Sequence, residues 1–173
     1  MNNWKERIVL MLMVRDEMYK TDRDGLWEYH FPEVAASGDE IKTVQEKLKV
    51  SLSEEYVNFL LHANGWKCFY QLVDLFGTEE LGGDAMMYAK RLLDVETDNS
   101  EELRNLKDQL IPVAVSRADR DLFVMVLAKG SEYGKILWLA GGEIDRFDSF
   151  GDFFEAMIAY NREDLEDLKS SAP

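Results

Sequence analysis

The spacing of the hydrophobic residues changes at Pro112, and this change limits the fold more than any other feature of the chain. The stretch that follows contains short runs rich in Val, Ile, Leu, Phe and Trp, separated by turn-prone pairs such as Gly130-Ser131 and Gly141-Gly142. Such runs predict β-strands, and their close succession predicts an antiparallel meander. Residues 68–73 are expected to add an edge strand. The expected strands of the meander are residues 111–116, 121–128, 135–140 and 143–147.

Before Pro112 the apolar residues recur at the three- and four-residue spacing of amphipathic helices. Ser37 or Asp39 can cap the second helix and Ser53 the third. Asn64-Gly65 can take the left-handed conformation that ends the third helix. The polar residues 96–99 are expected to join the last two helices. The expected helices are residues 3–20, 37–49, 53–63, 84–94 and 100–110.

A last helix is expected to open at Ser149, with Asp152 as its capping-box partner. Helices, then strands, then a helix argue for an α+β fold in which an antiparallel β-sheet meander packs against helices. We expect a single domain over residues 1–173, of which only residues 170–173 form a tail. The buried face of the last helix is expected to consist of Phe150, Phe153, Phe154, Met157 and Ile158.

The first helix contains an unbroken apolar run at residues 8–14. The run follows Lys5 and Arg7 as in a signal peptide, but it meets Arg15 without a small-residue cleavage site and is far too short to span a bilayer. A helix that is apolar on more than one side is expected to be covered on both. A second subunit is one way to cover it, so a homodimer is among the expected assemblies.

The charge of the chain limits its partners. A formal net charge of -14 repels phosphate backbones and anionic lipid, so we expect no nucleic-acid or membrane partner. The same field attracts basic proteins. Cys68 is the only cysteine, which excludes an intrachain disulfide and fits a reducing compartment, so we expect a cytoplasmic protein.

Motifs for catalysis or metal binding are weak. His30 and His62 are the only histidines, and neither stands in an HExxH spacing; His62 with Cys68 would supply at most half a metal site. Glu143 and Asp145 alternate on one expected strand and would share a face, as acid/base pairs do. Alternating acids on an exposed hairpin are, however, ordinary solvated residues. We therefore expect a protein without catalytic residues, metal or cofactor.

An ordered set of weak motifs runs through most of the chain. It comprises Glu46 and Leu48, the helix entry Leu52-Ser53-Glu54-Glu55-Tyr56, Phe59-Leu60, Asn64-Gly65, Ile111-Pro112-Val113, Gly134-Lys135-Ile136-Leu137-Trp138 and Asp148-Ser149-Phe150-Gly151-Asp152-Phe153-Phe154. In this order the motifs resemble the SUKH superfamily, which groups fungal cell-wall synthesis regulators of the SMI/KNR type with many bacterial immunity proteins. Ser53 departs from the Leu-Pro entry that members often carry, although both residue types suit a helix start.

The resemblance covers residues 37–160 and implies an α+β SUKH fold without catalysis. Residues 83–110 form a helical insertion that serves partner choice or packing. For bacterial members the resemblance implies an immunity protein that binds and neutralises a cognate toxin, here through the toxin's C-terminal domain. A nuclease toxin needs a basic surface to hold phosphates, and an acidic protein can occupy that surface. The densest acidic region, residues 143–167, is the candidate contact.

Two other functions stay open at this point: a regulatory scaffold that binds several endogenous proteins, and a small hydrolase that uses Glu143 or Asp145. Trp66 also has two interpretations, as a core residue that closes the helical layer over the sheet or as an aromatic anchor at a binding surface. Tyr70 can share either role. The partner-binding candidates are Trp66, Tyr70, Glu143, Asp145, Asp148, Asp152 and Glu155.

Overall fold

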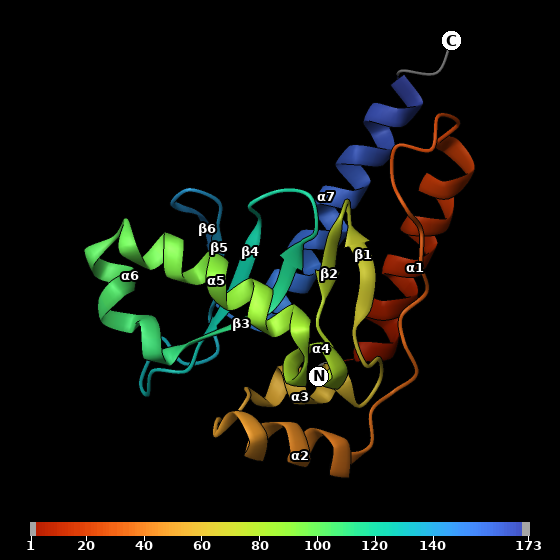
Figure 1. Cartoon of the computed structure of the whole chain (residues 1–173). Helices are drawn as coiled ribbons and strands as arrows, with labels where there is room; N and C mark the ends of the chain where they lie inside the picture. The colour runs from red at the N-terminus through yellow and green to blue at the C-terminus, as the bar shows by residue number, and fades with distance from the viewer. Residues whose placement is uncertain (1–2, 171–173) are drawn as a thin grey trace.

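The computed structural model describes residues 3–170, and most of the expected tail, residues 170–173, lies outside this range. Helices and strands follow one another as an α+β fold, which confirms the expected fold class (Figure 1). In chain order the elements are α1 (Trp4–Thr21), α2 (Gly38–Leu48), α3 (Glu54–Leu60), β1 (Trp66–Tyr70), β2 (Val73–Leu75), α4 (Thr78–Gly82), α5 (Asp84–Asp98), α6 (Glu101–Leu106), a 3-10 turn η1 (Lys107–Gln109), β3 (Leu110–Ser116), β4 (Leu122–Val126), β5 (Ile136–Leu139), β6 (Glu143–Phe147) and α7 (Phe150–Ser170).

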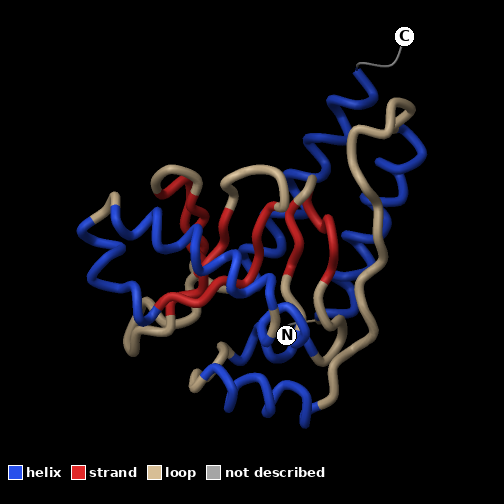
Figure 2. Tube along the Cα trace, in the orientation of Figure 1, coloured by secondary structure: helices blue, strands red, loops and turns tan. Residues whose placement is uncertain are grey.

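The strands form a single six-stranded sheet in which each pairs antiparallel with its neighbour in the chain (Figure 2). The meander expected after Pro112 is therefore confirmed. The single edge strand expected at residues 68–73 is wrong in detail, because the chain reverses at Gln71 and continues as a second strand, β2. Gln71 takes the left-handed conformation that this tight reversal needs, with φ 47°.

The sheet curls around α7. The ring of Phe153, on the first turns of α7, lies 5.8 Å from Phe69 of β1, 5.1 Å from Phe123 of β4 and 5.7 Å from Phe147 of β6, measured between centroids. In a flat sheet β1 and β6 would stand five strand spacings, or roughly 24 Å, apart. A single side chain touches both edge strands only because the sheet bends strongly. α7 fills the concave face, and α5 crosses the other side of β3 and β4 (Figure 1).

α1 packs along α7, and its Trp4 ring fits between Phe59, Phe150 and Phe154 at centroid distances of 5.4 to 5.6 Å. Within residues 3–170 only one side of α1 is covered, so the expected cover on its other side, for which a second subunit was one source, stays a prediction. The apolar run extends around the helix beyond the face that α7 buries. Its exposed members are Val9, Leu10 and Met13, which keep 54%, 38% and 64% of their surface accessible. No helix within residues 3–170 is long and apolar enough to cross a membrane.

The helix α3 ends earlier than its sequence suggests. It begins as expected at Ser53, whose Oγ accepts a hydrogen bond from the Tyr56 N–H, but it stops at Leu60 rather than at Asn64-Gly65. Gly65 has a positive φ of 92°. The position also requires glycine because a Cβ here would lie 2.6 Å from the backbone nitrogen of Gly77. Asn64-Gly65 thus lets the segment after α3 pass close to the backbone of residues 75–77. The Tyr56 hydroxyl secures this crossing by donating to the Phe76 carbonyl at 2.7 Å.

The insertion of residues 83–110 is joined to the rest of the fold by a buried carboxylate. The expected polar linker at residues 96–99 is wrong, because α5 continues to Asp98 and Glu96 is only 4% exposed. Glu96 accepts the backbone N–H groups of Gly141 at 2.7 Å and Gly142 at 2.8 Å, and it pairs with Arg120 at 3.4 Å. The insertion therefore holds the turn between β5 and β6 in place, in addition to packing on β3.

Glu96→Gln is expected to lower the free energy of unfolding by about 2 kcal/mol, because an amide offers one acceptor oxygen where the carboxylate offers two, and it leaves a partly buried N–H unpaired. Urea unfolding followed by circular dichroism measures the change. Glu102→Gln is the matched control: this exposed partner of Arg146 should contribute less than about 0.5 kcal/mol. Equal losses for the two variants would contradict the assignment, as would unchanged hydrogen exchange at Gly141 and Gly142.

Tyr56→Phe is expected to destabilise the fold by about 1–2 kcal/mol, because it leaves the buried Phe76 carbonyl without its donor. Tyr133→Phe serves as the control, since its hydroxyl donates to the Ser51 carbonyl at the surface, at 3.2 Å. Thermal unfolding should separate the two variants by several degrees. A Tyr56→Phe protein as stable as the control would show that the buried hydrogen bond contributes nothing.

Candidate partner-binding surface

Trp66 lies in the core and offers no ring to a partner. Only 1% of its surface is accessible, and its Nε1–H donates to the His30 carbonyl at 2.8 Å. The first of its two interpretations, a core residue, agrees with this placement. Tyr70, at the end of the same strand, is 9% exposed and reaches a different environment, described below.

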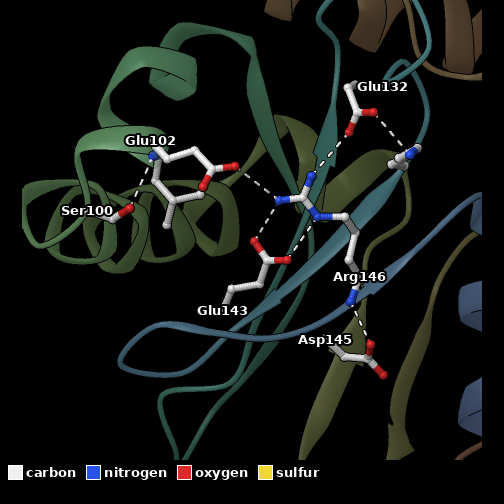
Figure 3. Close-up of polar contacts among 8 residues, drawn as sticks. Ser100, Glu102, Glu132, Glu143, Asp145 and Arg146 are labelled. Carbon is white, nitrogen blue, oxygen red and sulfur yellow. Dashed lines mark hydrogen bonds and ion pairs between the residues drawn. The ribbon is translucent and has the colours of Figure 1, made fainter.

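Glu143 is engaged inside the chain by Arg146. The Arg146 guanidinium lies 2.8 Å from Glu143, 3.2 Å from Glu132 and 3.4 Å from Glu102 on α6 (Figure 3). The hydrogen bond to Glu143, followed by the nearby negative charge, raises the pKa of Arg146 above its usual value. This cluster joins α6 to β6, and its negative charge is partly compensated before any partner arrives.

Three more of the predicted acids also have partners within the chain. Asp148 pairs with Lys135 at 3.3 Å, and Glu155 pairs with Arg7 at 2.6 Å. Asp152 accepts the hydroxyl of Ser149 at 2.9 Å and thereby helps to cap α7, as its sequence position predicts. Exposed ion pairs of this kind are weak. The two ion pairs nevertheless reduce the net charge that Asp148 and Glu155 present to a partner.

Asp145 differs from Glu143 in the element that it faces. Its Oδ2 accepts a hydrogen bond from the Tyr160 hydroxyl on α7 at 3.4 Å, whereas Glu143 reaches Arg146 and, through it, α6. Regular alternation would place residues i and i+2 on one face of a strand. The register between β5 and β6 shifts opposite these residues, between Trp138 and Leu139, and this irregularity breaks the alternation. The expectation that the two carboxylates share a face is therefore wrong.

Three aromatic rings from distant parts of the chain meet beside Asp145. Tyr70 of β1, Trp138 of β5 and Tyr160 of α7 lie 5.9 to 6.3 Å from one another between centroids. Trp138 also stacks on the buried Phe123 at 5.1 Å, which fixes its ring from one side. Trp138 and Tyr160 are half-buried and reach the surface. The three rings meet because the curled sheet brings β1 toward β5 over α7.

Four carboxylates surround these rings. Asp121 accepts the Trp138 Nε1–H at 2.7 Å, and Asp145 accepts the Tyr160 hydroxyl. On α7, Asp164 accepts the side-chain amide of Gln71 at 3.2 Å. We call the three rings together with these acids the acidic platform; its members are Tyr70, Trp138, Tyr160, Asp121, Asp145, Glu163 and Asp164.

The acids of the acidic platform lack the compensation found around Arg146. None of the four forms an ion pair with a basic side chain among residues 3–170. Burial, followed by the charges of Asp167 and Glu163, raises the pKa of Asp164. Burial and then the charges of Asp164 and Asp121 also raise the pKa of Tyr70. Burial is the larger cause of both shifts, and the neighbouring carboxylates add a smaller contribution that a bound cation would offset.

The sequence identified two members of the acidic platform, Tyr70 and Asp145, among the partner-binding candidates, and it placed Glu163 and Asp164 in the densest acidic region. Trp138, Tyr160 and Asp121 were missed as site residues. Trp138 stood in a strand motif and Tyr160 in a helix, so each had an ordinary structural explanation. Their convergence depends on contacts between residues that are distant in sequence, which no local pattern reports.

One group of side chains among residues 3–170 has the donors of a metal site: the ligand atoms of Glu28, His30 and Cys68 lie within 4.8 Å of one another. His30, rather than the expected His62, accompanies Cys68; His62 instead bonds to the Asn58 carbonyl at 2.7 Å. The guanidinium of Arg117 occupies this cluster, in contact with the Cys68 Sγ and 3.1 Å from Asp74. Burial also raises the pKa of the Cys68 thiol. The cluster thus already contains a cation supplied by the chain.

Comparison with known proteins adds the family. No curated protein matches the chain. A family model described as SMI1 / KNR4 family (SUKH-1) matches residues 35–156, close to the range over which the sequence motifs resemble that group. The match includes the sheet, residues 83–110 and the start of α7, and it leaves α1 and the last two thirds of α7 outside. Because it covers well over half of the chain, the protein belongs to the SMI1 / KNR4 family (SUKH-1).

Proposed function

We propose that this protein is a non-catalytic immunity protein that binds a cognate protein toxin in the cytoplasm and neutralises it. Membership of the SMI1 / KNR4 family (SUKH-1) supports a role in binding other proteins. The observation that carries the proposal is the acidic platform, where unpaired carboxylates lie beside partly exposed aromatic rings. Aromatic side chains supply much of the binding energy at protein interfaces, and unpaired charge selects a complementary partner.

The charge of the molecule supports a basic toxin domain as the partner. A domain that cleaves nucleic acid needs a positive surface to hold phosphates, and an acidic protein that covers this surface blocks the substrate directly. A net charge of -14 would also speed the encounter through electrostatic steering. Neutralisation then requires only binding, with no chemical step.

The geometry of β6 disfavours the hydrolase alternative. An acid/base pair needs two carboxyl groups that face one substrate. Asp145 points toward Tyr160 on α7, and Glu143 is held by Arg146 in the cluster next to α6. The two carboxyl groups thus have partners on different elements, an arrangement that does not favour an acid/base pair.

The regulatory scaffold remains the alternative function, and one observation favours it. The exposed side chains of Val9, Leu10 and Met13 on α1 present an apolar strip apart from the acidic platform. A second contact surface of this kind suits a protein that joins several partners, and it equally suits the homodimer expected from the sequence. Analytical ultracentrifugation at micromolar concentration distinguishes a dimer from a monomer.

The first test is calorimetric titration with the C-terminal domain of a toxin encoded beside this gene, at low and at physiological salt. Nanomolar, one-to-one binding that weakens as salt rises is the expected result. In stopped-flow measurements of the same pair, the variant Asp121→Asn/Asp145→Asn/Glu163→Gln should reduce the association rate constant about tenfold, because it removes charge from the contact surface.

The control variant, Asp24→Asn/Asp39→Asn/Asp108→Asn, removes the same charge from exposed positions on other elements and should bind nearly as the unaltered protein does. Equal effects of the two variants would mean that total charge matters and the acidic platform does not. Absence of binding at both salt concentrations, together with failure to rescue cells that express the toxin domain, would reject the immunity function.

A further inference from the structure

The acidic platform has the chemistry of a receptor for one basic side chain. Its rings are held by their own polar atoms: Trp138 Nε1–H donates to Asp121, the Tyr160 hydroxyl reaches Asp145, and the Tyr70 hydroxyl accepts from Gln71 at 3.3 Å. These bonds place carboxylates at the edges of the rings. A cation over a ring face would therefore meet both the ring quadrupole and a carboxylate.

We infer that the acidic platform binds an arginine side chain of the partner protein, with the guanidinium stacked on the Tyr160 ring, next to Trp138, whose plane stands at 61° to it, and paired with Asp145 or Asp121. This inference rests on the proposed function for the identity of the partner as a basic protein. A guanidinium is planar, stacks on aromatic rings and pairs with carboxylates through two parallel hydrogen bonds. An ammonium group lacks the planar geometry, so arginine should bind better than lysine.

The chain itself contains a comparable contact between one guanidinium and several carboxylates. Around Arg146, three carboxylates converge on a guanidinium that the chain supplies (Figure 3). The acidic platform has four carboxylates, and within residues 3–170 none of them forms an ion pair with a basic side chain. A basic side chain of the partner would supply the counter-charge.

Arg15 acts on one acid of the acidic platform, Asp164, but cannot pair with the others at the surface. Arg15 acts through its charge and is only 3% exposed. Its guanidinium already donates to the Asn161 side chain at 3.1 Å and to the Glu28 carbonyl at 2.7 Å, and it packs on the Tyr29 ring. Arg15 therefore reduces the negative potential of the platform from a buried position.

The first experiment uses a small probe and needs no toxin. The indole N–H resonance of Trp138, identified by its loss in Trp138→Phe, is followed while N-acetyl-arginine-N-methylamide is added to the full-length protein. A saturating shift with the arginine probe, a smaller one with the lysine analogue and none with the uncharged, isosteric citrulline analogue is the expected order. Equal shifts with citrulline, or no shift with arginine, would overturn the inference.

The second experiment measures the partner complex. Tyr160→Ala should weaken toxin binding about tenfold, since it removes a ring that a desolvated cation covers. Tyr160→Phe keeps the ring and should lose less than about threefold. Tyr133→Ala, at another partly exposed tyrosine, should have no effect. Thermal unfolding establishes that each variant is folded, and a Tyr160→Ala protein that binds as tightly as Tyr133→Ala would overturn the inference.

The two experiments separate this inference from the proposed function. An arginine-specific shift at Trp138 without toxin binding would support the receptor and reject the immunity function. The opposite result is tight toxin binding that Tyr160→Ala leaves unchanged, together with no shift of the Trp138 resonance on addition of the arginine probe. This result would support the immunity function and reject the arginine receptor.

Discussion

The contact between Phe153 and both edges of the sheet is the constraint on which the rest of the fold depends. An antiparallel meander by itself stays open, and its first and last strands do not meet. The ring of Phe153 contacts aromatic residues of β1, β4 and β6 at once, so the sheet has to bend around α7. Two turns later, Asn161 continues this role: its amide donates to the Phe69 carbonyl of β1 and its oxygen accepts from Arg15 of α1. The acidic platform arises from the same bend, because only a curled sheet brings Tyr70 and Trp138 together.

Local patterns in the sequence predicted the helices and strands better than the contacts between them. The bounds of β6, a cap at Ser37 or Asp39 and the buried face of α7 followed from strand composition, the residue types that cap helices and helical spacing, and the structure uses Ser37 as the cap. The short α4 and the chain reversal at Gln71 were missed, because few residues carry their signal. The burial of Glu96 could not be predicted, because its partners at Gly141 and Gly142 belong to another part of the chain.

The candidate site shows the same difference between composition and arrangement. The sequence counts acidic residues and indicates where they are dense, between residues 143 and 167. The fold then divides them: Glu143, Asp148 and Glu155 meet basic side chains from other elements, whereas Asp145 and Asp164 do not. A high local density of acids is therefore a poor guide to the charge that a surface presents. The deciding quantity is whether the fold supplies a counter-charge.

The hydrogen bonds from the β5–β6 turn to Glu96 affect which substitutions the neighbouring surface of β6 tolerates. The carboxylate binds backbone N–H groups, so it places no demand on the side chains of the strands that flank the turn. It does demand glycine at both turn positions, where φ values of 80° and 135° exclude ordinary side chains. The exposed residues of β6 can therefore be replaced without disturbing this hold on the turn, whereas Phe147 stays fixed by its contact with Phe153.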